Sequence, residues 1–308
     1  MIEVSNYDYY DYDYAQYWKN RRYEDSAEKH ILNNIFAKKN GDWFIDIGGS
    51  YGRLTETYYH SYSHPIILDY SLKTLQKNYS VIKKHFPSIE LIAANAYHMP
   101  FKEDTFDGGL MVRVLHHISE PAVYYKELRR IMHNGSTYIQ EFANKMNLKA
   151  SLRAIINLNF KYFSSAPYQQ PSAQNFEGTK KGEEAIFLSY KPEFIEKLLN
   201  SQNFKIINKF GCSYLRSTTL KKILGEDKMI KIEKVLQKIL KTTNIPPSII
   251  YESRLTSNHI QKNPKALTDI LVCPKCNGKL DFKGNSAYCP ICKLDFKKKS
   301  NVWDFRID

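Results

Sequence analysis

Residues 43–54, Trp-Phe-Ile-Asp-Ile-Gly-Gly-Ser-Tyr-Gly-Arg-Leu, decide how this chain folds. The run from Trp43 to Ile47 is apolar except for Asp46, and a short apolar run that ends in glycine predicts a buried parallel strand. Three glycines then predict a tight turn, and residues 53–59 can continue as a helix. A strand, a glycine turn and a helix form the ligand-binding unit of open α/β sheets, because the helix N-terminus offers free N–H groups.

The spacing of these glycines argues against a dinucleotide site. The dinucleotide pattern G-x-G-x-x-G, counted from Gly48, requires glycine at Ser50 and a small residue at Arg53. The chain instead has Asp46 before the turn and Gly52 at its end. This row resembles motif I of class I S-adenosylmethionine (SAM) methyltransferases, (D/E)-x-G-x-G-x-G, with Ser50 in place of the middle glycine. The alternative is a generic strand–helix turn of another α/β protein.

A second apolar run, residues 65–70, predicts the next strand and carries Asp69 near its end. An acidic residue at this position can accept hydrogen bonds from both hydroxyls of a ribose. Asp69 follows Asp46 at the separation that a strand–helix–strand unit requires. The pair therefore predicts a nucleoside-binding edge on the sheet.

Residues 95–118 make the resemblance more specific. They contain Asn-Ala-Tyr-His-Met-Pro-Phe at 95–101, a strand pattern at 106–112 and Leu-His-His at 115–117. This order is similar to D-A-x-x-L-P-F … F-D-x-V … L-H-H in type-11 methyltransferases, the group that includes ubiquinone- and menaquinone-biosynthesis enzymes. Asn95 replaces the family's frequent aspartate, but an amide can still hydrogen-bond to an adenine edge. The resemblance implies a SAM-dependent enzyme with an α/β fold, doubly wound around a mostly parallel seven-stranded sheet.

The resemblance also implies where the cofactor and the chemistry lie. Asp69 is expected on the ribose, and Asn95 with Ala96 on the adenine. His116 and His117 lie where a general base can reach a hydroxyl or amide nucleophile. The alternative for this pair is structural, with one ring facing solvent and the other packed against the next helix. The implied cofactor-binding residues are Asp46, Gly48, Gly49, Ser50, Gly52, Asp69, Asn95, Ala96 and Arg113.

Apolar periodicity predicts the remaining elements. A helix at 17–38 often covers the cofactor in this family, so it adds Tyr17, Trp18, Arg22 and Tyr23 as candidates by analogy. The expected strands are 43–47, 65–70, 89–94, 106–112, 136–142, 204–212 and 248–254. The expected helices are 17–38, 53–59, 72–86, 120–132, 192–201 and 220–241, with a turn at 134–135.

Four of the five cysteines form two C-P-x-C pairs with twelve residues between them. Thiolates at this spacing predict one tetrahedral Zn²⁺ site, with a rubredoxin-type iron site as the rival. So short a segment needs a metal to fold, and free thiols indicate a reducing cytoplasm. The segment resembles the small zinc-ribbon activator subunit of tRNA and translation-factor methyltransferases. The expected ligands are Cys273, Cys276, Cys289 and Cys292.

Composition bounds the partners. The chain has 308 residues, is 43% hydrophobic and carries a net charge of +13. It has no apolar run long enough for a transmembrane helix and no apolar N-terminal segment typical of a signal peptide. Residues 143–270 hold 21 basic and 10 acidic side chains, which favours a polyanionic partner such as RNA. The alternative is a proteome in which lysine is the default surface residue.

These patterns predict five segments: an N-terminal lid and helix (1–40), a methyltransferase domain (41–256), a substrate-lid insertion within it (144–190), a linker (257–269) and a zinc ribbon (270–308). The first 18 residues alternate tyrosine and aspartate, so a flexible aromatic lid or a disordered segment is expected there. No pattern defines an oligomeric state.

Three functions remain open from the sequence. The first is methylation of a small or lipid-like molecule, which an enclosed apolar cavity under 144–190 would favour. The second is methylation of RNA (tRNA) or a translation protein with a built-in zinc-ribbon activator, which a lysine face with exposed aromatics would favour. That face would gather Lys209, Lys221, Lys222, Lys231, Lys234 and Lys238. The third is a non-catalytic scaffold, which the intact pair Asp46 and Asp69 disfavours.

Overall fold

The computed structural model of this chain describes residues 8, 14–170, 186–257 and 264–307. The helices are α1 (Tyr14–Lys19), α2 (Arg22–Phe36), α3 (Thr55–Tyr58), α4 (Leu72–His85), α5 (Pro121–Ile131), α6 (Leu148–Ile156), α7 (Pro192–Ser201), α8 (Thr218–Leu224), α9 (Glu226–Ile239) and α10 (Leu267–Ile270). The strands are β1 (Gly41–Ile47), β2 (Tyr62–Asp69), β3 (Glu90–Ala93), β4 (Phe106–Met111), β5 (Met132–Ala143), β6 (Tyr168–Gln169), β7 (Leu188–Ser189), β8 (Phe204–Cys212), β9 (Ser248–Leu255), β10 (Asp281–Lys283), β11 (Ser286–Cys289), β12 (Leu294–Lys299) and β13 (Val302–Asp304).

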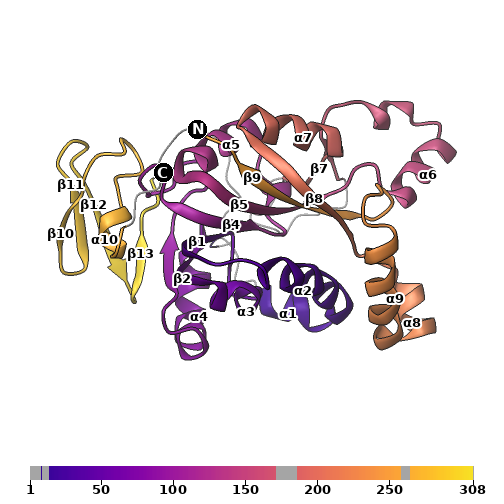
Figure 1. The fold of residues 1–308 in the computed structure, drawn as a ribbon, viewed down its shortest axis with the longest axis horizontal. Helices are drawn as coiled ribbons and strands as arrows, with labels where there is room; N and C mark the ends of the chain where they lie inside the picture. Colours follow the sequence, from indigo (N-terminus) through magenta and orange to yellow (C-terminus); the bar gives the residue numbers. More distant parts are fainter. Residues whose placement is uncertain (1–7, 9–13, 171–185, 258–263, 308) are drawn as a thin grey trace.

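One mixed sheet with helices on both faces forms the centre of the molecule (Figure 1). Its strand order is β10-β11-β12-β13-β3-β2-β1-β4-β5-β9-β8. The strands from β3 to β5 pair in parallel, and β9 and β8 add antiparallel strands at the far edge. The part from β3 to β8 is the expected doubly wound, seven-stranded sheet, so the predicted α/β fold class is confirmed.

Alternation along the strands separates two apolar cores, one on each face of the sheet. On β1, Trp43 and Ile45 belong to the core that α5 and α7 cover, whereas Phe44 belongs to the core under α2 and α4. Every residue from Trp43 to Ile47 is buried. Helices on both faces explain why this strand is an almost continuous apolar run. No helix in the described part of the chain is both long and apolar enough to cross a bilayer.

Three local predictions are wrong. The helix expected at 17–38 is divided into α1 and α2, and the helix expected at 220–241 is divided into α8 and α9. The second break falls at Gly225, whose φ of +72° is a left-handed conformation that ends a helix. The turn expected at 134–135 lies inside β5, where pairing with β4 shifts register between Phe106 and Gly108. Gly135, with φ +82°, lets the strand pass through this irregularity.

The cysteine-rich segment continues the central sheet. Its last strand, β13, pairs in parallel with β3, with Trp303 opposite Ile92. Phe305 N–H donates to the Ala93 carbonyl at 2.8 Å, and both aromatic rings join the core beneath α5. An edge strand covered in this way has fewer free backbone groups. The division of the chain at 257–269 stays a prediction, since 258–263 lie outside the described residues, as do 1–7, 9–13 and 171–185 of the two expected lids.

Replacing Trp303 by alanine is expected to lower the free energy of unfolding by about 3–5 kcal/mol, because it removes a buried indole at the joint between β13 and β3. Equilibrium urea unfolding followed by circular dichroism measures this. Tyr288→Ala is the matched control, since this ring is 42% exposed on β11. A loss of less than about 1 kcal/mol is expected for it. Equal losses in both variants would show that Trp303 does not anchor the ribbon to the sheet.

Candidate functional site

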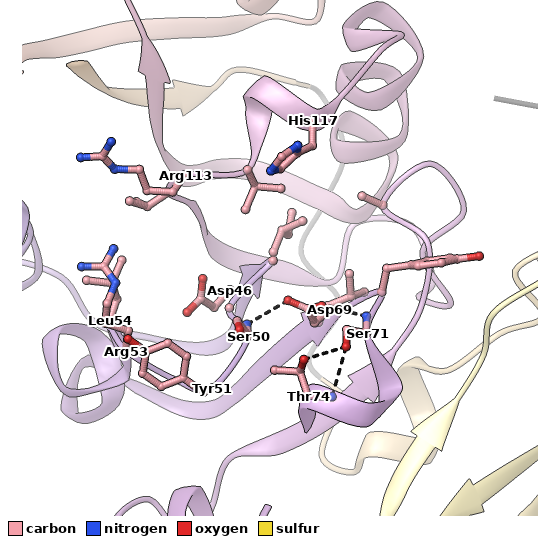
Figure 2. A pocket seen from close by; sticks show the side chains of 18 of the residues that line it. Asp46, Ser50, Tyr51, Arg53, Leu54, Asp69, Ser71, Thr74, Arg113 and His117 are labelled. Carbon is pink, nitrogen blue, oxygen red and sulfur yellow. Dashed lines mark hydrogen bonds between the residues drawn. The ribbon is translucent and has the colours of Figure 1, made fainter. Parts of the chain in front are cut away.

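A pocket opens at the carboxyl ends of β1, β2 and β4, and we call it the glycine-loop pocket (Figure 2). Eight of the nine residues expected to bind a cofactor line it, and Gly52 is the exception. Gly52 instead closes the turn, where its N–H donates to the Gly49 carbonyl at 2.9 Å. The residues brought together are Asp46, Gly48, Gly49, Ser50, Asp69, Asn95, Ala96 and Arg113.

The backbone of the glycine turn leaves little choice of residue. Gly48 has φ +75°, and a Cβ there would lie 2.3 Å from a methyl group of Val114. Ser50, which replaces the family's middle glycine, has φ +50°. A serine in this left-handed region is strained, and such strain concentrates at functional sites. Arg113 at the end of β4 is strained in the same way, with φ +63°.

Two carboxyl groups face this pocket (Figure 2). Asp69 accepts hydrogen bonds from the N–H groups of Ser50 at 2.9 Å and Ser71 at 2.8 Å. Burial raises the pKa of Asp69 to about 6, although these two hydrogen bonds oppose the shift. Asp46 accepts a hydrogen bond from the Tyr58 hydroxyl at 2.9 Å, and burial raises its pKa to about 7. Two carboxyls of raised pKa at one strand edge are typical of a binding site rather than of a structural ion pair.

A buried ion-pair network closes the other side of the pocket. Glu28 of α2 is fully buried and contacts Arg53 at 2.6 Å and Arg113 at 2.7 Å. Burial opposes ionisation of Glu28, but Arg113 and Arg53 hold its pKa below the ordinary value. The ring of Trp18 stacks over the Arg53 guanidinium at 3.6 Å. Helix α1 is thereby fixed against the glycine turn.

Sequence reasoning missed Glu28. The available signal was its place on the apolar face of α2, one helical turn before Leu32, where an acidic residue requires a buried partner. Of the four candidates by analogy, Trp18 lines the glycine-loop pocket and Tyr17 lines the neighbouring pocket. Arg22 and Tyr23 line neither and instead contact α9, through Asp227 and Glu233 respectively.

A second cavity of about 600 Å³ lies beneath α6, and we call it the α6 pocket. It lies under the insertion expected at 144–190 and is lined from α1, α6, β7 and the ends of β4 and β5. Trp18 and Arg113 line both pockets and so form a shared wall. Its other lining side chains are mixed, with Leu148, Leu152 and Phe187 beside polar groups.

The histidine pair lies at this wall. His117 lines the glycine-loop pocket and His116 lines the α6 pocket. Both side chains are buried, so the alternative in which one ring faces solvent is wrong, because the chain before β7 returns over them. His116 stacks on Phe187 with ring centroids 4.1 Å apart, and His117 Nδ1 donates to the Ile186 carbonyl at 2.8 Å.

Burial favours the neutral form of both histidines. It lowers the pKa of His117 to about 4 and the pKa of His116 well below its ordinary value. Among the described residues, the buried Nε2 of His116 has no hydrogen-bond partner. A neutral ring with an unpaired buried nitrogen is suited to contact a ligand in the α6 pocket.

The α6 pocket carries an excess of positive charge. Arg153 and Arg216 line it, and neither guanidinium pairs with a carboxylate within the described residues. The charge of Arg113 nearby lowers the pKa of Arg216. Among the described residues that line this cavity, Glu141 is the one acidic side chain, and it already accepts the Arg113 N–H at 3.1 Å.

The four cysteines of the C-terminal segment meet at one point. Their sulfur atoms all lie within 4.8 Å of one another, and Cys276 and Cys289 Sγ are 3.6 Å apart. Tetrahedral Zn²⁺ with Zn–S bonds of about 2.3 Å requires sulfurs about 3.8 Å apart. Backbone N–H groups of Gly278 and Cys292 donate to two of the sulfurs at 3.4 Å each, as expected around thiolates. The donor set therefore fits a structural zinc ion.

Comparison with known proteins supports one chemistry. The family model described as "Methyltransferase domain" matches residues 45–139. The chain is 24% identical to MJ1252, an uncharacterized protein of Methanocaldococcus jannaschii, over 207 residues that cover 66% of this chain and 76% of that protein. It is 28% identical to demethylmenaquinone methyltransferase of Paenarthrobacter aurescens over 117 residues, which cover 38% of this chain and 45% of that protein.

Solved structures share the fold. One is the complex between the Trm112 methyltransferase activator of Haloferax volcanii and a methyltransferase, with a TM-score of 0.52, 11% identity, and coverage of 80% of this chain and 94% of that chain. A methyltransferase of Clostridium acetobutylicum described as S-adenosylmethionine-dependent gives a TM-score of 0.52 at 15% identity, covering 79% of this chain and 97% of that one. At these identities the likeness shows the fold alone.

Replacing Glu28 by glutamine is expected to lower the free energy of unfolding by about 3–5 kcal/mol, because it leaves two partly buried guanidinium groups without their shared carboxylate. Asp25→Asn is the matched control, since Asp25 also pairs with Arg53 but is a quarter exposed. A change of about 1 kcal/mol or less is expected there. Urea unfolding of both variants makes the comparison, and a small effect at Glu28 would refute the role given to this network.

Proposed function

Because this chain is a class I SAM-dependent methyltransferase, we propose that it methylates a small or lipid-like molecule held in the α6 pocket. The observation that carries the proposal is the shared wall of Trp18 and Arg113 between the α6 pocket and the glycine-loop pocket. Methyl transfer from a sulfonium needs donor and acceptor aligned across one opening, which is mainly a matter of orientation. Two adjoining cavities supply that arrangement.

The glycine-loop pocket is the proposed SAM site. When bound, SAM supplies an electrophilic methyl group on a positively charged sulfur. We assign Asp69 to the ribose hydroxyls and Asn95 with Ala96 to the adenine, since these residues line successive parts of the pocket. Gly48, Gly49 and Ser50 let the backbone approach the ligand closely, and Asp46 contributes negative charge. The role of Arg113 is to hold the shared wall, where it pairs with Glu28.

The acceptor side of the wall suits an electron-rich molecule. His116 lies on this side, and its buried Nε2, which has no partner among the described residues, is placed to contact a hydroxyl of the acceptor. Arg153 and Arg216 favour an acceptor with negative charge, while Leu148, Leu152 and Phe187 favour an apolar body. Assignment of His116 and His117 as catalytic residues rests on this placement.

Methylation of RNA or a translation protein is the second candidate. Its support is the basic segment 143–270 and the ribbon, which resembles a separate activator subunit. Two of the lysines expected to form a binding face already have partners within the chain: Lys209 donates to Asn244, and Lys221 pairs with Glu24. The exposed apolar residues of α8 and α9 are isoleucines and a valine, and these side chains offer no aromatic ring on which RNA bases could stack. The cavity under α6, whose lining is mixed rather than purely apolar, supports the first candidate instead.

Asp69→Asn is expected to weaken SAM binding by about 1–3 kcal/mol at pH 8, because an amide cannot accept both ribose hydroxyls as a carboxylate does. The pKa of Asp69 is about 6, so the wild-type group is protonated at about pH 5. The difference between wild type and variant should therefore shrink on acidification. Calorimetric titration of SAM at both pH values tests this.

Asn78→Ala, in α4 outside the pocket, serves as the control for this titration and should bind SAM as the wild type does. Absence of SAM binding in the wild type would refute the proposed site. Adding total tRNA to the same titration separates the two acceptor classes, since tight, steeply salt-dependent binding would favour RNA.

We further propose that Cys273, Cys276, Cys289 and Cys292 hold a structural Zn²⁺. Their convergent sulfurs support this, as does the small apolar content of a segment that folds against β3. Zinc here would stabilise the joint between ribbon and sheet and take no part in methyl transfer. Four cysteines that bind zinc instead of forming disulfides support a reducing, cytoplasmic location.

Purified protein is expected to contain one zinc per chain, and Cys289→Ser should lose it together with several kcal/mol of stability. Cys212→Ser is the matched control, because Cys212 is buried in β8 away from the cluster. This control should keep its zinc. Elemental analysis and thermal unfolding give both readouts. Iron with thiolate absorption bands would support the rubredoxin-type alternative, and absence of any metal would refute the proposal.

A further inference from the structure

The outer side of α6 and the residues after it expose an unusual amount of apolar surface. Ile155 and Ile156 of the helix are 50% and 78% exposed, and Leu158 and Phe160 beyond it are 74% and 66% exposed. Ala154 is the one buried residue of the helix. Exposed apolar side chains are usually scattered singly, whereas a contiguous set marks an interaction site. We call Ile155, Ile156, Leu158 and Phe160 the α6 apolar surface.

Basic residues are interleaved with this surface. Lys149, Arg153 and Lys161 accompany it, and no aspartate or glutamate occurs between residues 142 and 176. Lys149 and Arg153 are exposed, and neither forms an ion pair with another described residue. A helix that combines an exposed apolar side with basic residues is typical of binding in the interface of anionic membranes.

The position of α6 suits such a contact. It projects from the end of the molecule opposite the ribbon, so that it can approach a flat surface without the sheet or the ribbon intervening (Figure 1). Its inner side lines the α6 pocket through Leu148, Lys149, Leu152 and Arg153. One short helix therefore separates the pocket from the exposed apolar side chains.

We propose that the α6 apolar surface docks on a membrane that contains anionic lipids, and that the acceptor enters the α6 pocket from that bilayer. The second half rests on the proposed function, whereas the first half does not. The apolar side chains insert among the acyl chains and Lys161 contacts the lipid phosphates, while the exposed Lys149 and Arg153 beside the α6 pocket add positive charge that attracts the anionic surface.

Two other occupants fit less well. A second copy of the chain would bring Lys149, Arg153 and Lys161 of both copies together, and like charges at an interface oppose association. RNA would match the charge, but isoleucine and leucine offer no ring on which bases stack, and Phe160 is the one aromatic member. A bilayer with anionic lipids matches both the charge and the aliphatic character.

The test is cosedimentation of the full chain with vesicles of phosphatidylcholine, with and without phosphatidylglycerol. The wild type is expected to bind the anionic vesicles, and more weakly as salt is added. Ile156→Glu combined with Leu158→Glu should reduce partitioning at least about tenfold, because both charges would enter the acyl region. Val81→Glu is the matched control, since Val81 is 61% exposed on α4 near lysines and should leave partitioning within about twofold.

The outcomes separate the parts of the proposal. No binding of the wild type to anionic vesicles, or equal binding by the double variant, overturns the docking surface. Self-association of the wild type that the double variant loses, seen by sedimentation velocity without vesicles, would assign the surface to a second copy and overturn it as well. SAM binding is measured on every variant and should not change, because neither position lines the glycine-loop pocket. Vesicle binding without SAM binding would retain the docking surface and refute delivery of a methyl acceptor.

Discussion

The buried carboxylate of Glu28, held between Arg53 and Arg113, is the contact on which the site depends. These three residues come from α2, from the turn after β1 and from the end of β4. A lone carboxylate in this position would be too costly to bury, and the same holds for each guanidinium. The three segments therefore stabilise one another. Their closure also fixes Trp18 over Arg53, which creates the wall shared by the two pockets.

The two pockets on either side of this wall differ in charge. Asp46 and Asp69 face the glycine-loop pocket, and the charge of Asp69 adds to the burial that raises the pKa of Asp46. A positively charged ligand in this pocket would favour the ionised form of both carboxyl groups. Arg153 and Arg216 face the α6 pocket, where an electron-rich ligand is favoured instead. Carboxyl groups in one pocket and guanidinium groups in the other suit the proposed reaction between a cationic methyl donor and a nucleophile.

The ribbon is connected to the same site through a short series of hydrogen bonds. Arg306, just after β13, donates to Asp8 at 2.8 Å, and Asp8 also accepts from the Ser71 hydroxyl at 2.6 Å. Ser71 caps α4 and donates its N–H to Asp69. The pairing of β13 with β3 brings Arg306 to this position, so folding of a small cysteine-rich segment supports the edge where a ribose is proposed to bind.

Features that depend on neighbouring residues could be predicted from the sequence alone. The apolar run before Gly48, Asp69 at the end of the next strand and the two cysteine pairs follow from local spacing, and these predict strands, turns and a four-thiol cluster directly. Four features could not be predicted in this way: Glu28 contacts Arg113, both histidines are buried, β13 pairs with β3, and a second pocket lies under α6. Each of these depends on segments far apart in the chain, whose contacts are set by the packing of the whole sheet rather than by the period of any one segment.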